Sequence, residues 1–209
     1  MKTKFLAVVM GVTLTAASGM ACAQFGGLGK IAGIGGDAAG ASVSSDQIVN
    51  KYVGGAKNVN KADVKMLRAV GLKDEADKAE LAGKNLTEGA TKDSLEEASK
   101  TQTESSKALE AKMKDKKVEM DAKSKQQFSD GMGDLARGII QYVGMGGDAK
   151  NFKPSPTSIG GSTNSALFVV KSLPDSIKAL GGTLKSSIDF AKTNNIPVPK
   201  EANDATSMI

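Results

Sequence analysis

The side chains that most often carry out enzymatic chemistry are nearly absent from this chain. Its 209 residues include one cysteine, Cys22, and no histidine. Imidazole is the usual general base, thiolate is a strong nucleophile, and both are common metal ligands. The acidic residues lie mostly beside lysines at ion-pair spacing, without an isolated, apolar-framed pair of the kind that raises a carboxyl pKa. We therefore predict no catalytic residue, no metal ligand, no cofactor and no enzymatic activity.

The surroundings of Cys22 are typical of the end of an export signal. Lys2 and Lys4 precede an apolar run from Phe5 to Val12, and Ala21-Cys22-Ala23 has the A-x-A form that signal peptidase recognises. The apolar run is too short and too rich in Thr and Gly to cross a bilayer about 30 Å thick. We predict a signal peptide over residues 1–23, cleaved after Ala23, and a periplasmic or secreted mature protein.

An alternative interpretation makes Cys22 the acylated first residue of a lipoprotein. Such sites resemble Leu-small-small-Cys, whereas Gly19 stands in the leucine position here. We favour cleavage after Ala23. The mature chain would then contain no cysteine, and therefore no disulfide, although an exported protein could hold one.

The bulk composition excludes one class of partner and favours a fold class. Aromatic residues make up 4% of the chain and tryptophan is absent, whereas nucleic-acid binding needs concentrated basic patches with aromatic side chains for stacking. We predict no nucleic-acid partner. The hydrophobic fraction of 40% includes much alanine, so few large side chains are available for a compact core. This composition favours an elongated all-α bundle.

Residues 24–45 are rich in Gly, Ala and Ser, and we predict a flexible lead-in there. Gly33 to Ala38 fits a relaxed G-x-G-x-x-A nucleotide motif, but the strand that should precede such a motif is missing. Apolar residues also recur every three positions from Phe25 to Ile34, which leaves membrane contact as a further interpretation of this segment.

From residue 46 onward the hydrophobic spacing becomes helical, and residues 46–194 are predicted to form a single domain. Ser45-Asp46 suits the start of a first short helix, which Gly54-Gly55 should end. Asn60 suits the start of a second helix over 61–70, with Gly71 at its C-terminal end. A third short helix is predicted over 73–84.

One long, polar helix is predicted over residues 91–143, because this stretch has no proline and its first glycine is Gly131. Its sparse apolar residues keep to one face. Ser94 and Glu97 form an S-x-x-E capping box, and the polar Gln102 and Ser105 interrupt the apolar seam. Residues 100–125 are the densest in charge, so we expect this part to project or to pair loosely and to contact a partner; disorder is the alternative.

A loop over 148–163, with Pro154 and Pro156, is predicted to precede a C-terminal amphipathic helical region over 164–194, on which the long helix packs. Pro174 should kink this region or begin a second helix. Residues 195–209 are predicted to be an extended or frayed tail.

One phrase occurs twice in the sequence. Residues 52–59, YVGGAKNV, resemble residues 142–152, YVGMGGDAKNF. We expect both phrases to end helices, with glycines supplying left-handed backbone. A duplicated unit with a pseudo-symmetric partner site is the alternative, although the match is too short to establish duplication.

These observations together predict an exported, non-enzymatic helical protein of the bacterial cell envelope that acts by binding another envelope protein or the cell surface. The alternative is a membrane-active or membrane-associated secreted protein, with residues 25–34 and 166–170 as the membrane-contacting segments. Neither segment is long enough to span a bilayer.

Overall fold

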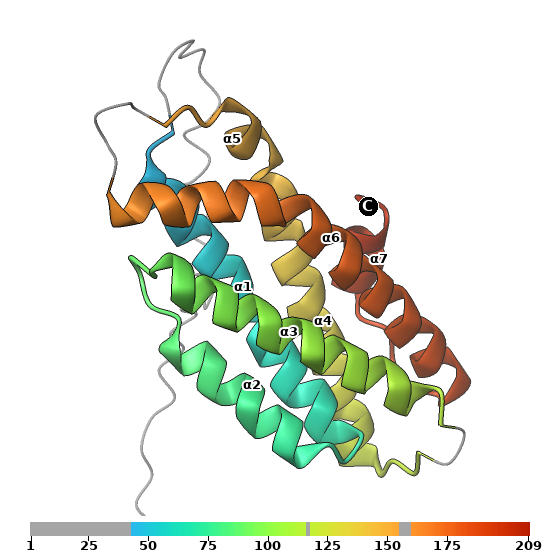
Figure 1. Ribbon diagram of the computed structural model, residues 1–209. Helices are drawn as coiled ribbons and strands as arrows, with labels where there is room; N and C mark the ends of the chain where they lie inside the picture. Colours follow the sequence, from blue (N-terminus) through green and yellow to red (C-terminus); the bar gives the residue numbers. More distant parts are fainter. Residues whose placement is uncertain (1–42, 116–117, 155–159) are drawn as a thin grey trace, which may run out of the picture. The chain divides into compact units, whose positions relative to one another are not determined.

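The computed structural model describes residues 43–115, 118–154 and 160–209, which form seven α-helices and no strand (Figure 1). The helices are α1 (Ser45–Ala69), α2 (Lys73–Asn85), α3 (Lys92–Met113), α4 (Ala122–Gly144), α5 (Gly146–Asn151), α6 (Gly161–Thr193) and α7 (Lys200–Thr206). They share one hydrophobic core, so the predicted all-α bundle is confirmed. The predicted signal peptide with Cys22, the glycine motif at 33–38 and nearly all of the lead-in lie outside the described residues.

Helix α1 is the central helix, in contact with α2, α3, α4 and α6. It begins with a capping box: the Ser44 hydroxyl accepts a hydrogen bond from the Gln47 backbone N–H, and the Gln47 side chain accepts one from the Ser44 N–H. The N-cap is therefore Ser44, one residue before the predicted start. Beyond the helix, Gly71 has a φ of +87°, a left-handed conformation that favours glycine.

The structure has one continuous helix, α1, where the sequence predicted two helices with breaks at Gly54-Gly55 and Asn60. Glycine in a helix interior costs about 1 kcal/mol relative to alanine, but Gly55 is buried against α4, where packing compensates for that cost. Asn60 does not cap a new helix, because its side-chain Nδ2 donates to the Ala56 carbonyl oxygen of the same helix.

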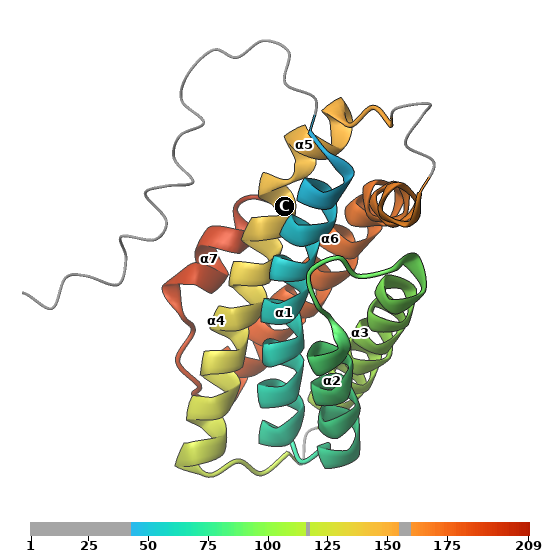
Figure 2. The same cartoon turned by 90° about the vertical axis from the view of Figure 1, so that its left-hand side faces the viewer.

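Helices α1 and α4 run antiparallel in close contact, and glycines make this approach feasible (Figure 2). A Cβ added at Gly55 would lie 2.4 Å from the Tyr142 ring, and one at Gly138 would lie 2.6 Å from Val59 Cγ2. The Cβ added at Gly138 would also lie 3.1 Å from the Gly55 carbonyl oxygen, so the backbone of one helix lies against the other. A Cβ at Gly131 would lie 2.4 Å from the Met66 side chain, which extends the contact along the pair.

Two stacked tyrosines fill this contact near the N-terminal end of α1 and the C-terminal end of α4. The Tyr52 and Tyr142 rings are buried, with centroids 4.9 Å apart and planes within 8° of parallel. These residues begin the two repeated phrases, which therefore lie against each other in space. The predicted helix end is confirmed for the second phrase, because α4 ends at Gly144, and is wrong for the first, which lies inside α1. The expected left-handed backbone is wrong for both phrases, because none of their glycines has a positive φ.

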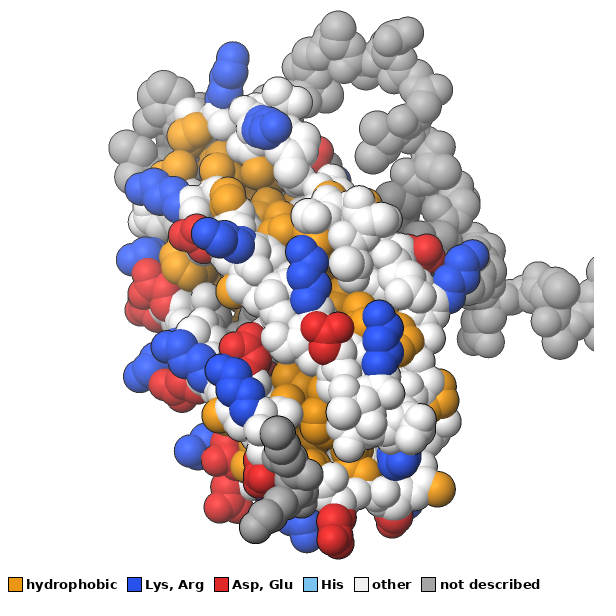
Figure 3. Space-filling view, turned by 90° about the vertical axis from the view of Figure 1, so that its right-hand side faces the viewer, with side chains coloured by type: hydrophobic (Ala, Val, Ile, Leu, Met, Phe, Trp, Pro, Cys, Tyr) orange, Lys and Arg blue, Asp and Glu red, His pale blue; other side chains and the backbone are white. Residues whose placement is uncertain are grey.

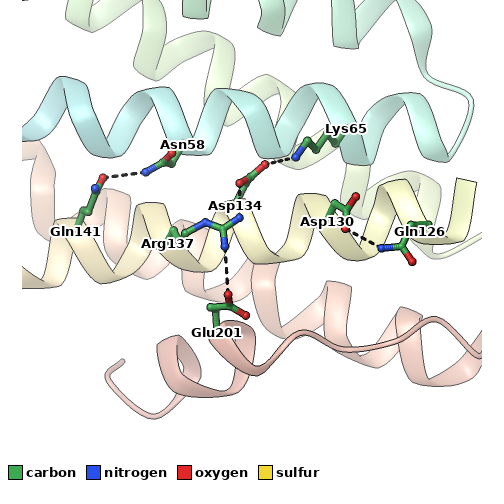
Figure 4. A network of polar contacts seen from close by, with 8 residues as sticks. All are labelled: Asn58, Lys65, Gln126, Asp130, Asp134, Arg137, Gln141 and Glu201. Carbon is green, nitrogen blue, oxygen red and sulfur yellow. Dashed lines mark hydrogen bonds and ion pairs between the residues drawn. The ribbon is translucent and has the colours of Figure 1, made fainter. Parts of the chain in front are cut away.

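A row of polar contacts follows the α1–α4 pair, with partners recurring every seven residues, about two helical turns (Figure 4). It consists of the pairs Lys51 with Asp148, Asn58 with Gln141, and Lys65 with Asp134. Arg137 also contacts Asp134, at 2.6 Å, and donates to Glu201 of α7 at 3.2 Å. The row therefore links α7 to the central helix pair.

The single helix predicted over 91–143 is two helices, α3 and α4, in the structure. An unbroken helix of that length would extend ~80 Å and could not return its apolar face to the core. The break falls in the charge-dense stretch, and the N-cap of α4 is Asp121, whose carboxylate accepts a hydrogen bond from the Ser124 N–H at 2.7 Å. Residues 100–113 do not project, because α3 packs against α6, α2 and α1.

Helix α3 begins earlier than the S-x-x-E motif indicated. Its N-cap is Thr91, whose hydroxyl accepts a hydrogen bond from the Ser94 backbone N–H. Ser94 is consequently the third residue of the helix rather than its cap. A threonine at an N-cap satisfies one of the free N–H groups of the first turn as a serine does, so the two positions were equally suitable on sequence alone.

The C-terminal region is more helical than predicted. Helix α6 runs unbroken from Gly161 to Thr193 with Pro174 inside it, and it lies beside α3 (Figure 1). Helix α5, residues 146–151, includes the first residues of the loop that was expected over 148–163. The predicted extended or frayed tail contains α7, whose Ala202 and Ala205 are fully buried against the bundle. These small side chains allow α7 to pack on α4, which fixes the tail in place.

We expect the neighbouring substitutions Gly54→Ala and Gly55→Ala to change stability in opposite directions. A methyl group at Gly54 has its nearest neighbour 4.0 Å away, so the helix gains up to about 1 kcal/mol of propensity. A methyl group at Gly55 meets the Tyr142 ring and should destabilise the fold by about 1–3 kcal/mol. Urea unfolding followed by far-UV circular dichroism measures both, and equal effects of the two substitutions would contradict the close α1–α4 contact.

Candidate functional site

A groove of about 460 Å³ is lined by residues of α1, α2 and the first part of α4. Figure 2 shows these three helices side by side, with α1 between the other two. Val64 of α1, which is half-buried, contributes apolar surface to its lining, and the fully buried Ala79 of α2 lies beneath it. Basic residues also line the groove: Lys57, Lys61, Lys65 and Arg68 from α1, and Lys84 from α2. The volume is within the range typical of small-ligand sites.

The spacing of residues along α1 and one glycine of α2 shape the groove. Lys57, Lys61, Val64 and Arg68 follow one another at intervals of four, three and four residues, so they share one face of the helix. Gly83 lets α2 approach that face, because a Cβ there would lie 3.1 Å from the Asn60 Cβ. The continuity of α1 through Asn60 is what places Lys57 and Lys61 on the same surface.

Acidic residues neutralise the Arg68 end of the groove. The Arg68 guanidinium contacts Asp77 at 2.8 Å and Glu80 at 2.6 Å, and Glu80 also contacts Lys84 at 2.6 Å. Hydrogen bonds from Lys84 and Arg68 hold the pKa of Glu80 below its ordinary value, while those to Asp77 and Glu80 raise the pKa of Arg68. This end of the groove is therefore a closed network of paired charges.

The other end of the groove carries positive charge without partners. Lys57 and Lys61 are exposed, and neither makes an ion pair with any part of the chain that the structure describes. Lys65 lies beside them but pairs with Asp134 at 2.6 Å. Burial raises the pKa of Asp134, but hydrogen bonds from Lys65 and Arg137 outweigh it and leave that pKa below its ordinary value. The free positive charge of the groove is thus concentrated on Lys57 and Lys61.

A second groove, of about 430 Å³, follows the line where α3 lies beside α6. Hydroxyl and amide side chains line most of it, including Gln102, which interrupted the apolar seam in the sequence, while Ser105 is buried. The Thr183 hydroxyl donates to Glu110 across the groove at 2.9 Å. The segment predicted to contact a partner, residues 100–125, therefore supplies one wall of a polar helix contact.

Asp63 is the buried carboxyl group that sequence analysis did not single out. Its side chain is 2% exposed, its Oδ2 has no hydrogen-bond partner, and burial raises its pKa well above the ordinary value. A perturbed carboxyl is a candidate acid or base, but Asp63 lines neither groove. Within the described ranges, no group of three or more acidic or cysteine side chains is placed to hold a metal ion.

The structure tests only part of the proposed membrane contact. Ala166 and Val169 are buried in the core side of α6, so the 166–170 segment packs into the bundle. The 25–34 segment lies outside the described residues. Among the described helices, none combines the length and the apolar character that crossing a membrane requires.

Comparisons with known proteins give no match. No protein-family model matches this chain, and neither a curated protein nor a solved structure resembles it. The functional role is therefore inferred from the described residues and their chemistry.

The basic groove was not predicted from the sequence, although its residue pattern is present there. The interval pattern of Lys57, Lys61, Val64 and Arg68 is visible in the sequence. The predicted break at Asn60 placed Lys57 and Lys61 on different elements, which separated the two halves of the pattern.

We expect Asp63→Asn to change the pH dependence of stability. In the unfolded chain the carboxyl loses its proton near pH 4, whereas in the folded protein burial raises its pKa, so the folded state holds the proton longer. Stability should therefore fall as pH rises from about 4, by up to about 1.4 kcal/mol per pH unit, until the folded group also ionises. Asp63→Asn should remove this decline in urea-unfolding free energies measured between pH 4 and 8.

The matched control for this experiment is Asp175→Asn, which alters an exposed carboxylate of α6. It should leave the pH dependence close to that of the wild type. If Asp63→Asn and the wild type lost stability in parallel with rising pH, the buried carboxyl would not be the titrating group.

Proposed function

We propose that this chain is an exported, non-enzymatic helical protein of the bacterial cell envelope, and that it binds an acidic partner protein in the groove over α1. The proposed export derives from the charged, apolar and small-residue segments of positions 1–23. The proposed binding role derives from the described bundle.

The observation that carries the proposal is the pair of free lysines beside an apolar surface. Lys57 and Lys61 have no ion-pair partner among the described residues, and Val64 and Ala79 line the same groove. Acidic side chains of a partner would pair with the lysines while an apolar side chain of the partner would cover Val64, which is half-buried. Such a division between charged rim and apolar centre is typical of protein interfaces.

Binding is favoured over catalysis by the types of residue that line the groove. Lysine and arginine attract anions, but the groove has no nucleophile with an adjacent base among its lining residues. The carboxyl with the strongly raised pKa, Asp63, lies in the interior instead. The groove is thus equipped to hold an acidic group rather than to transform it.

Contact with an anionic membrane surface is a second candidate, favoured by one observation. Exposed lysines recur every seven residues along α6. Figure 3 shows basic side chains, with acidic ones among them, scattered over one face of the bundle. The row consists of Lys171, Lys178, Lys185 and Lys192. Basic residues near an anionic bilayer contribute about 1 kcal/mol each, but Asp175 and Asp189 interrupt this row.

Two charge-reversal variants separate these candidates. Lys57→Glu/Lys61→Glu alters the groove, and Lys171→Glu/Lys178→Glu alters the α6 row with the same number of charges. We expect the groove variant to weaken binding to soluble poly-L-glutamate by about tenfold or more, equivalent to about 1.4 kcal/mol, and the α6 variant to leave it nearly unchanged. Fluorescence anisotropy at ~50 mM and ~500 mM salt measures the binding and its screening.

Sedimentation with phosphatidylglycerol vesicles provides the other arm. Two results together would support the membrane candidate and contradict the groove proposal. The wild type would bind the vesicles but not poly-L-glutamate, and the α6 variant would not bind the vesicles. Equal losses in both variants would show that net charge, and not the groove, determines binding.

A further inference from the structure

We propose that the groove over α1 receives an acidic amphipathic helix of about three turns, supplied by a partner protein. This inference rests on the proposed function, because it specifies the shape and charge of the acidic partner. Three features of the molecule support it: the spacing of residues on α1, the small residues of the groove and the uneven distribution of charge in the groove.

The open face of α1 repeats the residue spacing by which α1 binds α4. On the α4 side the residues in contact are separated by four, three and four positions: Gly55, Val59, Ala62 and Met66. On the groove side the lining residues follow the same intervals: Lys57, Lys61, Val64 and Arg68. Intervals of this kind are those on which a second helix packs, because they bring side chains to one line along the axis. The groove therefore has the periodicity of a helix-binding face.

The dimensions of the groove also suit a short helix. Residues 57–68 extend ~17 Å along α1, which corresponds to about three helical turns. Figure 2 shows α1 running between α2 and α4, with both neighbours in contact with it. Gly83 has no side chain and Val64 is half-buried, so larger apolar side chains of the incoming helix could occupy the space beside them. Binding of amphipathic helices in grooves is a recurrent mode of recognition.

The uneven charge of the groove indicates where the acidic residues of the partner lie. Arg68 is already paired with Asp77 and Glu80, whereas Lys57 and Lys61 have no ion-pair partner in the described parts of the chain. The acidic side chains of the partner helix should therefore gather at the Lys57 end. The chain's own segment 24–42 does not complement this end, because its charged residues are one lysine and one aspartate, Lys30 and Asp37.

Three synthetic peptides test the inference. The first is a Glu-, Leu- and Ala-containing peptide of ~12 residues, held helical by a hydrocarbon staple, with Leu at helical spacing and Glu on the flanks. The second has the same composition with D-residues at its centre, which prevent the helix. The third is the stapled peptide with Gln in place of Glu. We expect the first to bind the full chain about tenfold more tightly than either of the others.

The protein variants locate the binding. The affinity of Lys57→Glu/Lys61→Glu for the stapled acidic peptide should fall by about tenfold or more. The affinity of Lys171→Glu/Lys178→Glu should equal that of the wild type. Val64→Gln should weaken the stapled peptide several-fold and leave poly-L-glutamate binding nearly unchanged, because it removes apolar contact without altering charge. Circular dichroism confirms that each variant retains its helical content.

Each contrary result has a distinct meaning. If the helical and the D-residue peptides bind equally, and both depend on Lys57 and Lys61, the helix inference is overturned while the acidic-partner function stands. If no acidic probe binds the wild type, both are overturned. A third result would be a dimer of the chain that Lys57→Glu/Lys61→Glu disrupts, while the stapled peptide fails to bind. In that case the occupant is a second copy of the chain, and the partner helix is overturned.

Discussion

Two helices can approach as closely as α1 and α4 do only where side chains are missing from the contact, and Gly55, Gly131 and Gly138 provide those gaps. Each glycine costs helix propensity, so the pair is stable because burial of the neighbouring side chains, including Val59 and Met66, outweighs that cost. The other helices then arrange themselves around the pair: α2 and α3 contact α1, α7 contacts α4, and α6 contacts both.

The groove is a consequence of this arrangement. Once one face of α1 is committed to α4 and others to α2, α3 and α6, the remaining face carries Lys57, Lys61 and Arg68 into solvent. The long aliphatic portions of such side chains can cover apolar surface while their charges stay hydrated. Acidic residues neutralise Arg68 but not the two lysines, and this asymmetry gives the groove a charged end and a neutral end.

Helical periodicity predicted the fold class and most of the apolar positions, but not the boundaries of the helices. The core residues Leu135, Ile139, Leu173 and Leu184 lie on the faces that the spacing indicated. The errors arose where tertiary contact overrides local preference. Gly55 was interpreted as a break because nothing in the sequence shows that Tyr142 will lie against it. The turn between α3 and α4 was missed because lysine, glutamate and alanine favour helix in isolation, and only the return of α4 to the core requires a turn.

The candidate site was less predictable than the fold. Its charges come from two helices, and the sequence does not reveal which face of α1 remains open until the packing of α4 and α2 is known. The absence of histidine and the single cysteine could be counted directly from the sequence. The unpaired state of Lys57 and Lys61 could not, because the partner of a lysine can be near in sequence, as Glu80 is to Lys84, or far from it, as Asp134 is from Lys65.

The stacked tyrosines have an optical consequence. Tyr52 and Tyr142 are the chain's only tyrosines, and it has no tryptophan, so essentially all of its absorbance near 280 nm and its intrinsic emission come from one ring pair. That pair sits in the contact between α1 and α4, where the two rings are nearly parallel. Any event that separates or rotates these helices alters the near-ultraviolet dichroism and fluorescence of the whole molecule. The protein thus contains its own label for the helix contact around which the bundle is built.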